Sequence, residues 1–577
     1  MKFLVKHINS KTCKHFCLLL ACVCFNQFSI LAQKQSAKKP NVIVILTDDM
    51  GYSDIGCFGS EINTPNIDRL AKNGLRFTQF YNTARCSPTR ASLLTGLYPH
   101  QAGMGHLSTE NFKEPGYTDD LSKNAVTMAE VFQQAGYATY MTGKWHIAKN
   151  IKSDGDKSNW PMQRGFQRFF GTLNGSGSFY DPGTLMSNNT FIAPGKNFYY
   201  TDAISDTAVK FINEHKRDKP FFFYVAYTGA HWPLHAPESE VQKYKGMYDN
   251  GWDATRQQRF EKLKKLGIIS NKAILTERGV DIPEWKDEHL KEWQVRRMEV
   301  YAAMIDVMDR GIGRIIDALE KKGELENTII FYMHDNGGCA EPLNSNQKEI
   351  PPTAEQKMGK AYATDSVFVG RQPAYTRDGE FIRSGKGVMA GPDSSWVAYG
   401  EEWANVSNTP FRLYKHWAHE GGIATPLIVH WPKGIKVKGQ LRTQPGHLID
   451  IMATCVAITG INYPKQFNGN EIQPYEGKSL LPAFNNKAIR REYIFWEHEG
   501  NRAIRVGKWK LVSRAKKNKV FTAADENAWE LYDMDSDPTE TKNLAETYPE
   551  KVKELSALWE KEAIRTKAKP WPWSTIK

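Results

Sequence analysis

The chain of 577 residues lacks the features that mark several common classes of protein. Only four of its eight cysteines lie beyond residue 32, and these are Cys57, Cys86, Cys339 and Cys455. Thiols spread this widely form neither a disulfide framework nor a CxxC metal motif. The sequence also contains no HExxH and no GxSxG, which argues against the common zinc-hydrolase and serine-hydrolase chemistries. No internal repeat and no low-complexity tract is present, so a repeat architecture is excluded.

Long apolar runs are scarce, and the one that stands out lies at the N-terminus. Residues 1–32 combine four lysines with an apolar segment from Phe16 to Leu31. This pattern predicts an export signal peptide cleaved near Ala32. Cys22 offers a lipoprotein cleavage site as the alternative, although the residues after it stay apolar where a tether would be polar. No later run approaches the roughly 18 apolar residues of a membrane span, so we expect a periplasmic or extracellular protein without an integral membrane segment.

Neither sign of charge dominates the sequence. Lysine and arginine exceed aspartate and glutamate by 12, and removal of the four lysines of the signal leaves a formal net charge of +8. A modest positive charge favours anionic substrates but is as common on proteins that merely carry solvated lysines. With 41% hydrophobic and 24% charged residues, the composition is that of a globular protein. We expect no nucleic-acid partner.

Several apolar segments predict the strands of a buried sheet. They are continuous rather than alternating, which is typical of parallel strands that are covered on both faces. Helix patterns fill the gaps between them, so the sequence predicts an α/β fold with a large, mostly parallel (mixed) sheet flanked by helices. The strand segments are 41–46, 138–141, 220–225, 328–332 and 426–430, and the helix segments are 65–74, 127–135 and 297–322.

The pattern of predicted secondary structure changes after Thr459. Short strand segments at 493–496, 502–506, 509–512 and 530–533 are separated by turns, and an amphipathic helix follows from Pro549 to Ile564. We therefore expect a main domain at 38–459 and a smaller α+β domain at 460–577 with an antiparallel sheet. Residues 337–408 lack periodicity and predict a long surface loop.

Polar side chains follow the predicted strands where each strand ends. Asp48 and Asp49 come after the first strand, and Asp335 and Asn336 come after the fourth. The carboxyl ends of parallel strands meet at one edge of a sheet, where functional groups gather. A set that offers only oxygen atoms suits a hard divalent cation, calcium or magnesium, better than zinc.

Cationic and nucleophilic side chains follow the same pattern. Lys144, His146, His231 and Lys415, if they converge with Arg90, form a cationic pocket that matches a tetrahedral anion. Histidine also transfers protons near neutral pH. Cys86 precedes a helix expected at 89–95, where the helix dipole favours a negatively charged nucleophile.

The segment that starts at Cys86 reads CSPTRASLLTG, which resembles the C-x-P-x-R-x4-T-G signature of the type I, formylglycine-dependent sulfatases. The resemblance runs from Pro40 to Leu544 and is greatest to the bacterial arylsulfatases. It implies the alkaline-phosphatase-like fold and the hydrolysis of sulfate esters.

The resemblance also implies a chemistry for Cys86. A separate maturation enzyme reads C-x-P-x-R and oxidises the thiol to an aldehyde, formylglycine (3-oxoalanine). Its hydrate attacks sulfur with one hydroxyl, and the second hydroxyl lets the enzyme expel sulfate and regenerate the aldehyde.

By the same resemblance, one calcium ion is bound by Asp48, Asp49, Asp335, Asn336 and residue 86. Asp335 is also placed to take the diol proton, and Arg90 holds the diol. Lys144 and Lys415 contact the sulfate group, with Lys386 as an alternative to Lys415. His146 assists release of sulfate, and His231 helps to protonate the leaving alcohol. His334 receives no role.

Two alternative functions remain open from the sequence. One is a phosphate or phosphonate ester hydrolase of the same superfamily, and the other is a non-catalytic protein that binds sulfated glycans. The substrate that we expect is a sulfated polysaccharide or oligosaccharide, or an aryl sulfate. Trp396, Tyr399 and Trp403 are candidates for stacking on sugar rings, or alternatively they pack the 337–408 loop onto the domain.

Overall fold

The computed structural model describes residues 38–108, 110–344, 346–347, 359–515 and 529–572. The predicted signal peptide, with Cys22, lies outside these residues. Within the described part, no helix combines the length and the apolar character that a bilayer crossing requires. None of the four cysteines in this part forms a disulfide bond.

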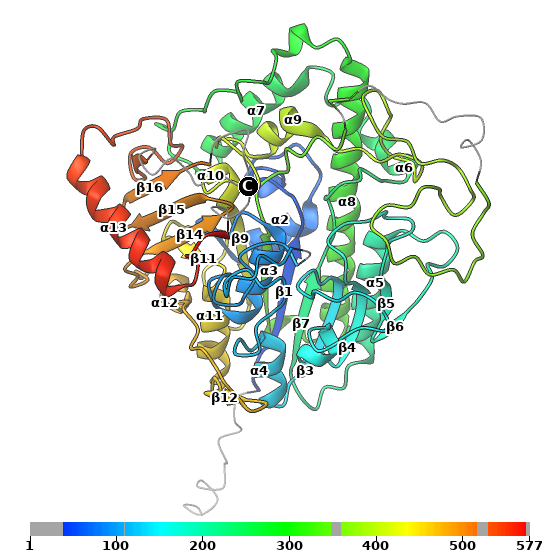
Figure 1. Ribbon diagram of the computed structural model, residues 1–577, viewed down its shortest axis with the longest axis horizontal. Coiled ribbons are helices and arrows are strands. Elements are labelled where there is room, and N and C mark those ends of the chain that lie inside the picture. The colour runs from blue at the N-terminus through cyan, green and yellow to red at the C-terminus, as the bar shows by residue number, and fades with distance from the viewer. Residues whose placement is uncertain (1–37, 109, 345, 348–358, 516–528, 573–577) are drawn as a thin grey trace, which may run out of the picture. The chain divides into compact units, whose positions relative to one another are not determined.

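A mixed sheet forms the centre of the described chain (Figure 1). Strands β8, β1, β7, β3 and β4 lie side by side and parallel, whereas β9 runs antiparallel to β8 and β2 antiparallel to β9. This confirms the predicted α/β class with a mostly parallel sheet. In spatial order the strands are β10 (Gln440–Arg442), β2 (Leu75–Tyr81), β9 (Ala424–His430), β8 (Thr328–His334), β1 (Asn41–Thr47), β7 (Phe221–Ala226), β3 (Ala138–Lys144), β4 (Arg168–Thr172), β5 (Leu185–Ser187) and β6 (Thr190–Phe191), and β11 (Gly446–His447) also pairs with β2.

Helices cover both faces of this sheet. Because side chains alternate along a strand, Ile43 and Ile45 of β1 pack into one core, and Val42 and Val44 pack into the other. The first core includes α5 and the long α8, and the second includes α3, α4 and α11. The helices are α2 (Pro65–Lys72), α3 (Cys86–Thr95), α4 (Met128–Gln134), α5 (Tyr200–Glu214), α6 (Glu238–Val241), α7 (Gly251–Lys265), α8 (Lys291–Lys321), α9 (Gly400–Ser407), α10 (Glu420–Ile423) and α11 (Asp450–Thr459).

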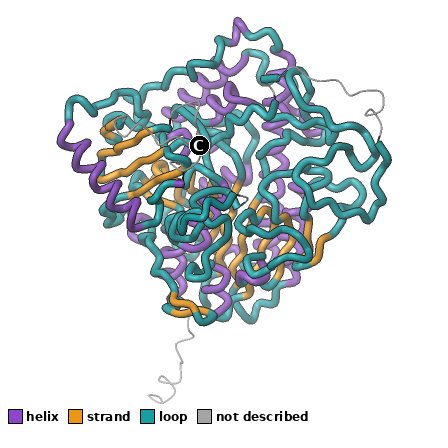
Figure 2. Tube along the Cα trace, viewed as in Figure 1, coloured by secondary structure: helices purple, strands orange, loops and turns teal. Residues whose placement is uncertain are grey.

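The C-terminal part contains the predicted antiparallel sheet. Strands β14 (Ile494–His498), β15 (Asn501–Val506), β16 (Trp509–Ser513) and β17 (Glu530–Asp533) pair in sequence order, and Gly507 turns the chain between β15 and β16. Helix α13 (Pro549–Arg565) packs on this sheet (Figure 2). The short elements β12 (Gln466–Phe467), β13 (Asn470–Glu471) and α12 (Leu481–Phe484) come before it. From Asn41 onward the described chain forms one compact unit. The boundary between a main domain and a smaller C-terminal domain at residues 459 and 460 therefore stays a prediction from the sequence.

The expectation that 337–408 lies on the surface is wrong for three of its aromatic residues. Trp396, Tyr399 and Trp403 are all buried. Trp403 packs edge-on against Trp252, and Tyr399 stacks on Tyr301 of α8 with ring centroids 4.4 Å apart. These rings therefore pack the loop onto the domain and cannot stack on a sugar.

One helix starts earlier than expected, and Thr64, which the sequence predicts as the cap of the helix that starts at Pro65, does not cap it. Helix α3 begins at Cys86 itself rather than near residue 89, because Thr89 N already donates to Arg85 O at 2.9 Å. Thr64 precedes α2, but its side chain makes no capping bond and instead accepts a hydrogen bond from Gly56 N at 2.8 Å. By contrast, Thr127 caps α4 with a full capping box.

Candidate active site

The carboxyl ends of β1 and β8 bring two of the predicted clusters together. Thr47 and His334 are register partners, so the residues that follow them are neighbours. Asp49 N donates to Asp335 Oδ1 at 3.2 Å, and Asn336 Nδ2 donates to Asp49 Oδ1 at 2.7 Å. The predicted oxygen cluster therefore exists as one buried group.

The donor set of this group fits a hard divalent cation. Asp48 Oδ1 and Asn336 Oδ1 are buried acceptors without a hydrogen-bond partner among the described residues. Burial raises the pKa of Asp48 well above its ordinary value, and the charge of Asp335 adds to that rise. A cation beside these carboxylates would offset both effects. Since every donor is an oxygen, calcium or magnesium is the appropriate type of ion.

Helix α3 carries Cys86 and Arg90 into this region. The guanidinium of Arg90 is fully buried and donates to Asp335 Oδ2 at 2.8 Å and to Lys144 O at 3.0 Å. Asp48 Oδ1 lies 3.6 Å from the same nitrogen that binds Asp335. Arg90 therefore joins the ends of β1, β3 and β8 to the helix whose first residue is Cys86.

Lys144 ends β3, and its ammonium group donates to Asp48 Oδ2 at 2.7 Å. The preceding Gly143 has φ 99°, and a Cβ there would lie 1.8 Å from Ala226 O of the adjacent β7. Only glycine lets the two strands approach this closely. Trp145 then points into the core and donates to Asn159 O at 2.8 Å, so its neighbours are turned toward the cluster.

His146 lies against the start of α3. Its carbonyl accepts a hydrogen bond from Ser87 Oγ at 2.8 Å, and a Cβ at Gly175 would lie 2.2 Å from the imidazole. The absence of a side chain at Gly175 therefore makes room for the ring. Burial lowers the pKa of His146 well below its ordinary value, and the charge of Lys144 lowers it further, so the imidazole is neutral at pH 7.

His231 and Lys415 approach Asp49 from two loops. His231 Nε2 lies 3.3 Å and Lys415 Nζ 2.8 Å from its carboxylate. Burial opposes ionisation of Asp49, but His231 and Lys415 outweigh it and hold the pKa of this carboxyl below its usual range. Lys386, the alternative to Lys415, is exposed on the surface.

The predicted residues thus form one network with six buried charges. Asp48, Asp49 and Asp335 face Arg90, Lys144 and Lys415, and His231 contacts the same group. Cys86 and His146 join it through the α3 backbone and the Ser87 contact. Every member is at least nine-tenths buried, so each charge depends on its neighbours in the network rather than on water.

The sequence reasoning missed several charged residues around this network. Arg85 donates to Glu341 at 2.9 Å and also contacts His416, and Glu341 accepts from Trp232 Nε1 at 2.7 Å. Glu341 and His416 keep about a quarter of their side chains exposed, at 25% and 23%. They come from separate loops without a motif, so the only available signal was that each lies close in sequence to a predicted residue.

His334, which had received no role, supports the site from behind. It is fully buried at the end of β8, and its Nδ1 lies 3.1 Å from Met50 O. Tyr332 OH lies 3.1 Å from its Nε2. His334 therefore fixes the loop that carries Asp48 and Asp49.

Comparison with known proteins places this chain in a family. The sulfatase family profile matches residues 40–461, and a second profile, N-sulphoglucosamine sulphohydrolase, C-terminal, matches 411–568. An arylsulfatase of Klebsiella aerogenes is 32% identical over 78% of this chain and 93% of its own length. An N-acetylglucosamine-6-O-sulfatase of Bacteroides thetaiotaomicron is 26% identical over 92% of this chain and 87% of its own.

A solved structure, in complex with its substrate D-glucosamine-2-N,6-O-disulfate, shares the fold. Its TM-score is 0.59 at 21% identity, and the match covers 93% of this chain and 100% of the other. The chain therefore belongs to the sulfatase family of the alkaline-phosphatase-like superfamily and is a sulfuric ester hydrolase.

Proposed function

We propose that the protein removes sulfate from sulfated sugars by means of a formylglycine made from Cys86, in a site that also holds one calcium ion. The observation that carries the proposal is the position of Cys86 as the first residue of α3, with Arg90 one turn later bonded to Asp335 and to the end of β3. A nucleophile at a helix N-terminus beside buried cations suits attack on a tetrahedral anion.

The chain's own residues divide the remaining work. Lys144 and Lys415 supply two buried ammonium groups for the sulfate oxygens, since each reaches one of the neighbouring aspartates Asp48 and Asp49. Arg90 orients residue 86. Asp335 accepts the proton of the hydroxyl group on residue 86 that attacks sulfur. His146, which is neutral, takes a proton when sulfate departs.

His231 is suited to protonate the leaving alcohol. Its Nδ1 donates to Trp232 O at 2.6 Å. Its Nε2 therefore points the other way and lies 3.3 Å from the Asp49 carboxylate. Burial lowers the pKa of His231 to about 3, so the ring becomes an acid only when an anion in the site raises that value. Calcium, when bound by Asp48, Asp49, Asp335 and Asn336, would supply positive charge to residue 86 and to the developing negative charge.

A sulfated sugar matches the surroundings of the buried network. The rim consists of Arg85, Glu341 and His416, together with Arg371, whose guanidinium lies over the Trp232 ring at 4.6 Å. Such groups suit the hydroxyls of a sugar better than the apolar ring of an aryl or steroid sulfate. The Bacteroides relative, named for a 6-O-sulfated amino sugar, supports the same class of substrate.

Mass spectrometry tests whether Cys86 is converted to formylglycine. Trypsin releases the peptide Cys86–Arg90, and protein exported by a host that has a sulfatase maturation enzyme is expected to give the formylglycine mass there. A Cys86→Ala variant from the same host is the control and is expected to be inactive. An intact thiol in active wild-type protein would refute the formylglycine nucleophile.

Sulfate release tests the substrate. We expect turnover of glucosamine 6-sulfate and of sulfated oligosaccharides with a higher kcat/KM than 4-nitrophenyl sulfate, and little turnover of 4-nitrophenyl phosphate. Release from the aryl ester alone would contradict the glycan assignment but not the sulfatase activity.

A further inference from the structure

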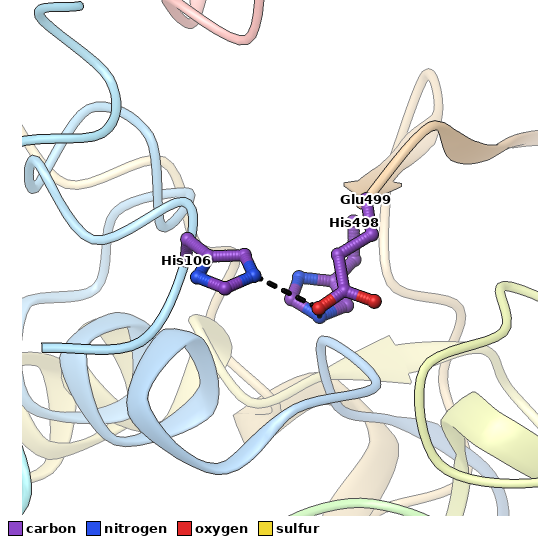
Figure 3. Close-up of side chains that lie close together, drawn as sticks. All are labelled: His106, His498 and Glu499. Carbon is purple, nitrogen blue, oxygen red and sulfur yellow. Dashed lines mark hydrogen bonds and ion pairs between the residues drawn. The ribbon is translucent and has the colours of Figure 1, made fainter. Parts of the chain in front are cut away.

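A second cluster of metal-binding side chains lies outside the predicted catalytic residues (Figure 3). His106 comes from the loop that follows α3, His498 ends β14, and Glu499 begins the turn to β15. One ligand atom from each of the three lies within 4.8 Å of the others. All three are buried, at 3%, 2% and 5% of full exposure.

The far nitrogen of His498 faces a backbone carbonyl, and that of His106 points toward a more distant carboxylate. His498 Nδ1 lies 3.3 Å from Gly105 O, and His106 Nδ1 lies 3.7 Å from the Glu110 carboxylate. The two Nε2 atoms consequently face Glu499 Oε1, at 2.8 Å from His106 and 3.4 Å from His498. Metal-binding histidines are oriented in this way, by a carbonyl or carboxylate on the nitrogen that does not bind the metal.

A positive ion between the three groups would satisfy the atom that is left over. His106 Nε2 forms a hydrogen bond to Glu499 Oε1, whereas His498, whose Nδ1 faces a carbonyl oxygen, presents a lone pair at Nε2 to a carboxylate that also has only lone pairs. His498 Nε2 makes no hydrogen bond within the described residues although it is buried and aimed at Glu499.

The spacing matches tetrahedral zinc. With ligand bonds of about 2.0–2.2 Å, neighbouring ligand atoms are separated by roughly 3.3 Å. The distance from His498 Nε2 to Glu499 Oε1 is already 3.4 Å, and His106 at 2.8 Å needs to withdraw by a fraction of an ångström. Two imidazoles and one carboxylate form a nitrogen-rich set that favours zinc over calcium.

A further residue holds the second oxygen of the carboxylate. His416 Nδ1 lies 2.9 Å from Glu499 Oε2, and its own Nε2 lies 3.2 Å from Glu341. His416 directly follows Lys415, which contacts Asp49. An ion at this cluster would therefore join the β14–β15 turn to the loop after α3 and fix the position of His416 at the rim of the active site.

We propose that His106, His498 and Glu499 form a zinc site that is separate from the predicted calcium site, with a water molecule completing the coordination. The proposal does not depend on formylglycine or on the identity of the sulfated substrate.

Zinc binding to tag-free, full-length protein tests the site. The protein is stripped with a chelator and dialysed into excess CaCl2, so that the oxygen cluster is saturated, and ZnCl2 is then titrated by calorimetry. We expect one zinc ion per chain, with at least about 100-fold weaker binding in His498→Gln and in Glu499→Gln. His416→Asn, which removes the contacts to Glu499 Oε2 and to Glu341 but none of the three proposed ligands, should weaken binding about 10- to 100-fold.

Two control variants separate this site from other histidines and from the oxygen cluster. His430→Gln changes a buried histidine in β9, and Asp49→Asn changes the other site. Both should bind zinc as the wild type does, and zinc should raise the Tm of these proteins but not of Glu499→Gln.

Cobalt supplies a readout that does not require a folded variant. Co²⁺ bound to wild-type protein should show the visible absorption of a four- or five-coordinate nitrogen and oxygen site, and zinc should displace it. Absence of a tight zinc site in the wild type, or zinc affinity unchanged in both His498→Gln and Glu499→Gln, would overturn the proposal.

Discussion

Lys510 is the best place to test whether the C-terminal sheet supports the active site. Its ammonium group is fully buried and lies 2.7 Å from Glu420 Oε1 and 2.7 Å from Glu540 Oε1. Glu420 begins α10, and Gly421 N donates to Arg412 O at 3.1 Å. These contacts close the loop that contains Lys415, so Lys510 holds that loop from β16.

Substitution of Lys510 by Met leaves two buried carboxylates without a partner. Loss of one partner of a buried ion pair costs about 3–5 kcal/mol. With about 2.1 cal/mol/K of unfolding entropy per residue, a unit that runs from Asn41 to Lys577 should lose about 3–4 °C of Tm. We also expect a lower kcat for sulfate release, because Lys415 is no longer held against Asp49 as firmly.

The pH dependence of the Tm separates this cause from a simple packing defect. In Lys510→Met, burial and mutual repulsion raise the pKa of both carboxyls above their values in the unfolded chain. The penalty is therefore full above those raised values and disappears as the pH falls through them. The difference in Tm between wild type and variant should thus narrow between pH 8 and pH 5.

Two further variants complete the test. Lys508 lies two residues before Lys510, is exposed and pairs with Asp533. Lys508→Met is therefore the matched control and should leave the Tm unchanged. Adding Glu420→Gln and Glu540→Gln to Lys510→Met should recover part of the lost stability, because the unpaired charges are gone. An equal loss at both pH values, or a normal Tm for Lys510→Met, would refute the reasoning.

Other expected outcomes follow from single contacts. Gly143→Ala should abolish sulfate release and lower the yield of folded protein, because its Cβ would lie 1.8 Å from Ala226 O, whereas Gly195→Ala, which has no atom within 4 Å, should behave as the wild type in both assays. Trp403→Ala should cost about 3–5 kcal/mol in denaturant unfolding with an unchanged KM for a sulfated oligosaccharide; a raised KM at normal stability would instead restore this ring to the substrate site. Glu497 is buried and accepts a hydrogen bond from His100 at 2.7 Å. Burial alone would raise the pKa of Glu497, but its hydrogen bonds outweigh that effect and lower the pKa. Its contribution to stability is full above the ordinary carboxyl pKa of about 4.3 and is lost as the pH falls through the lowered pKa of the folded state, so the Tm deficit of Glu497→Gln should shrink as the pH falls below about 4, and a constant deficit would contradict this. Removal of calcium by a chelator should abolish sulfate release, and CaCl2 but not ZnCl2 should restore it; full activity in the chelator would argue against the calcium site.

Much of the sheet was predictable because its strands are local, continuous apolar runs. The segments at 41–46, 328–332 and 426–430 all lie within observed strands, since a strand that is buried on both faces has no polar positions to obscure it. The polar residues that follow these strands were predictable for the same reason, because parallel strands end at one edge. The signature that begins at Cys86 is likewise contained within eleven consecutive residues.

Contacts between distant segments were decided by the tertiary structure alone. Trp396, Tyr399 and Trp403 belong to a segment without periodicity, and only their packing against α8 and Trp252 shows that they are core residues. His106 and Glu499 are 393 residues apart, and neither carries a local signal. Sequence by itself determines the fold class and predicts the proposed nucleophile, because both depend on short-range patterns, whereas the residues around the buried network and the second histidine cluster depend on loops that only folding brings together.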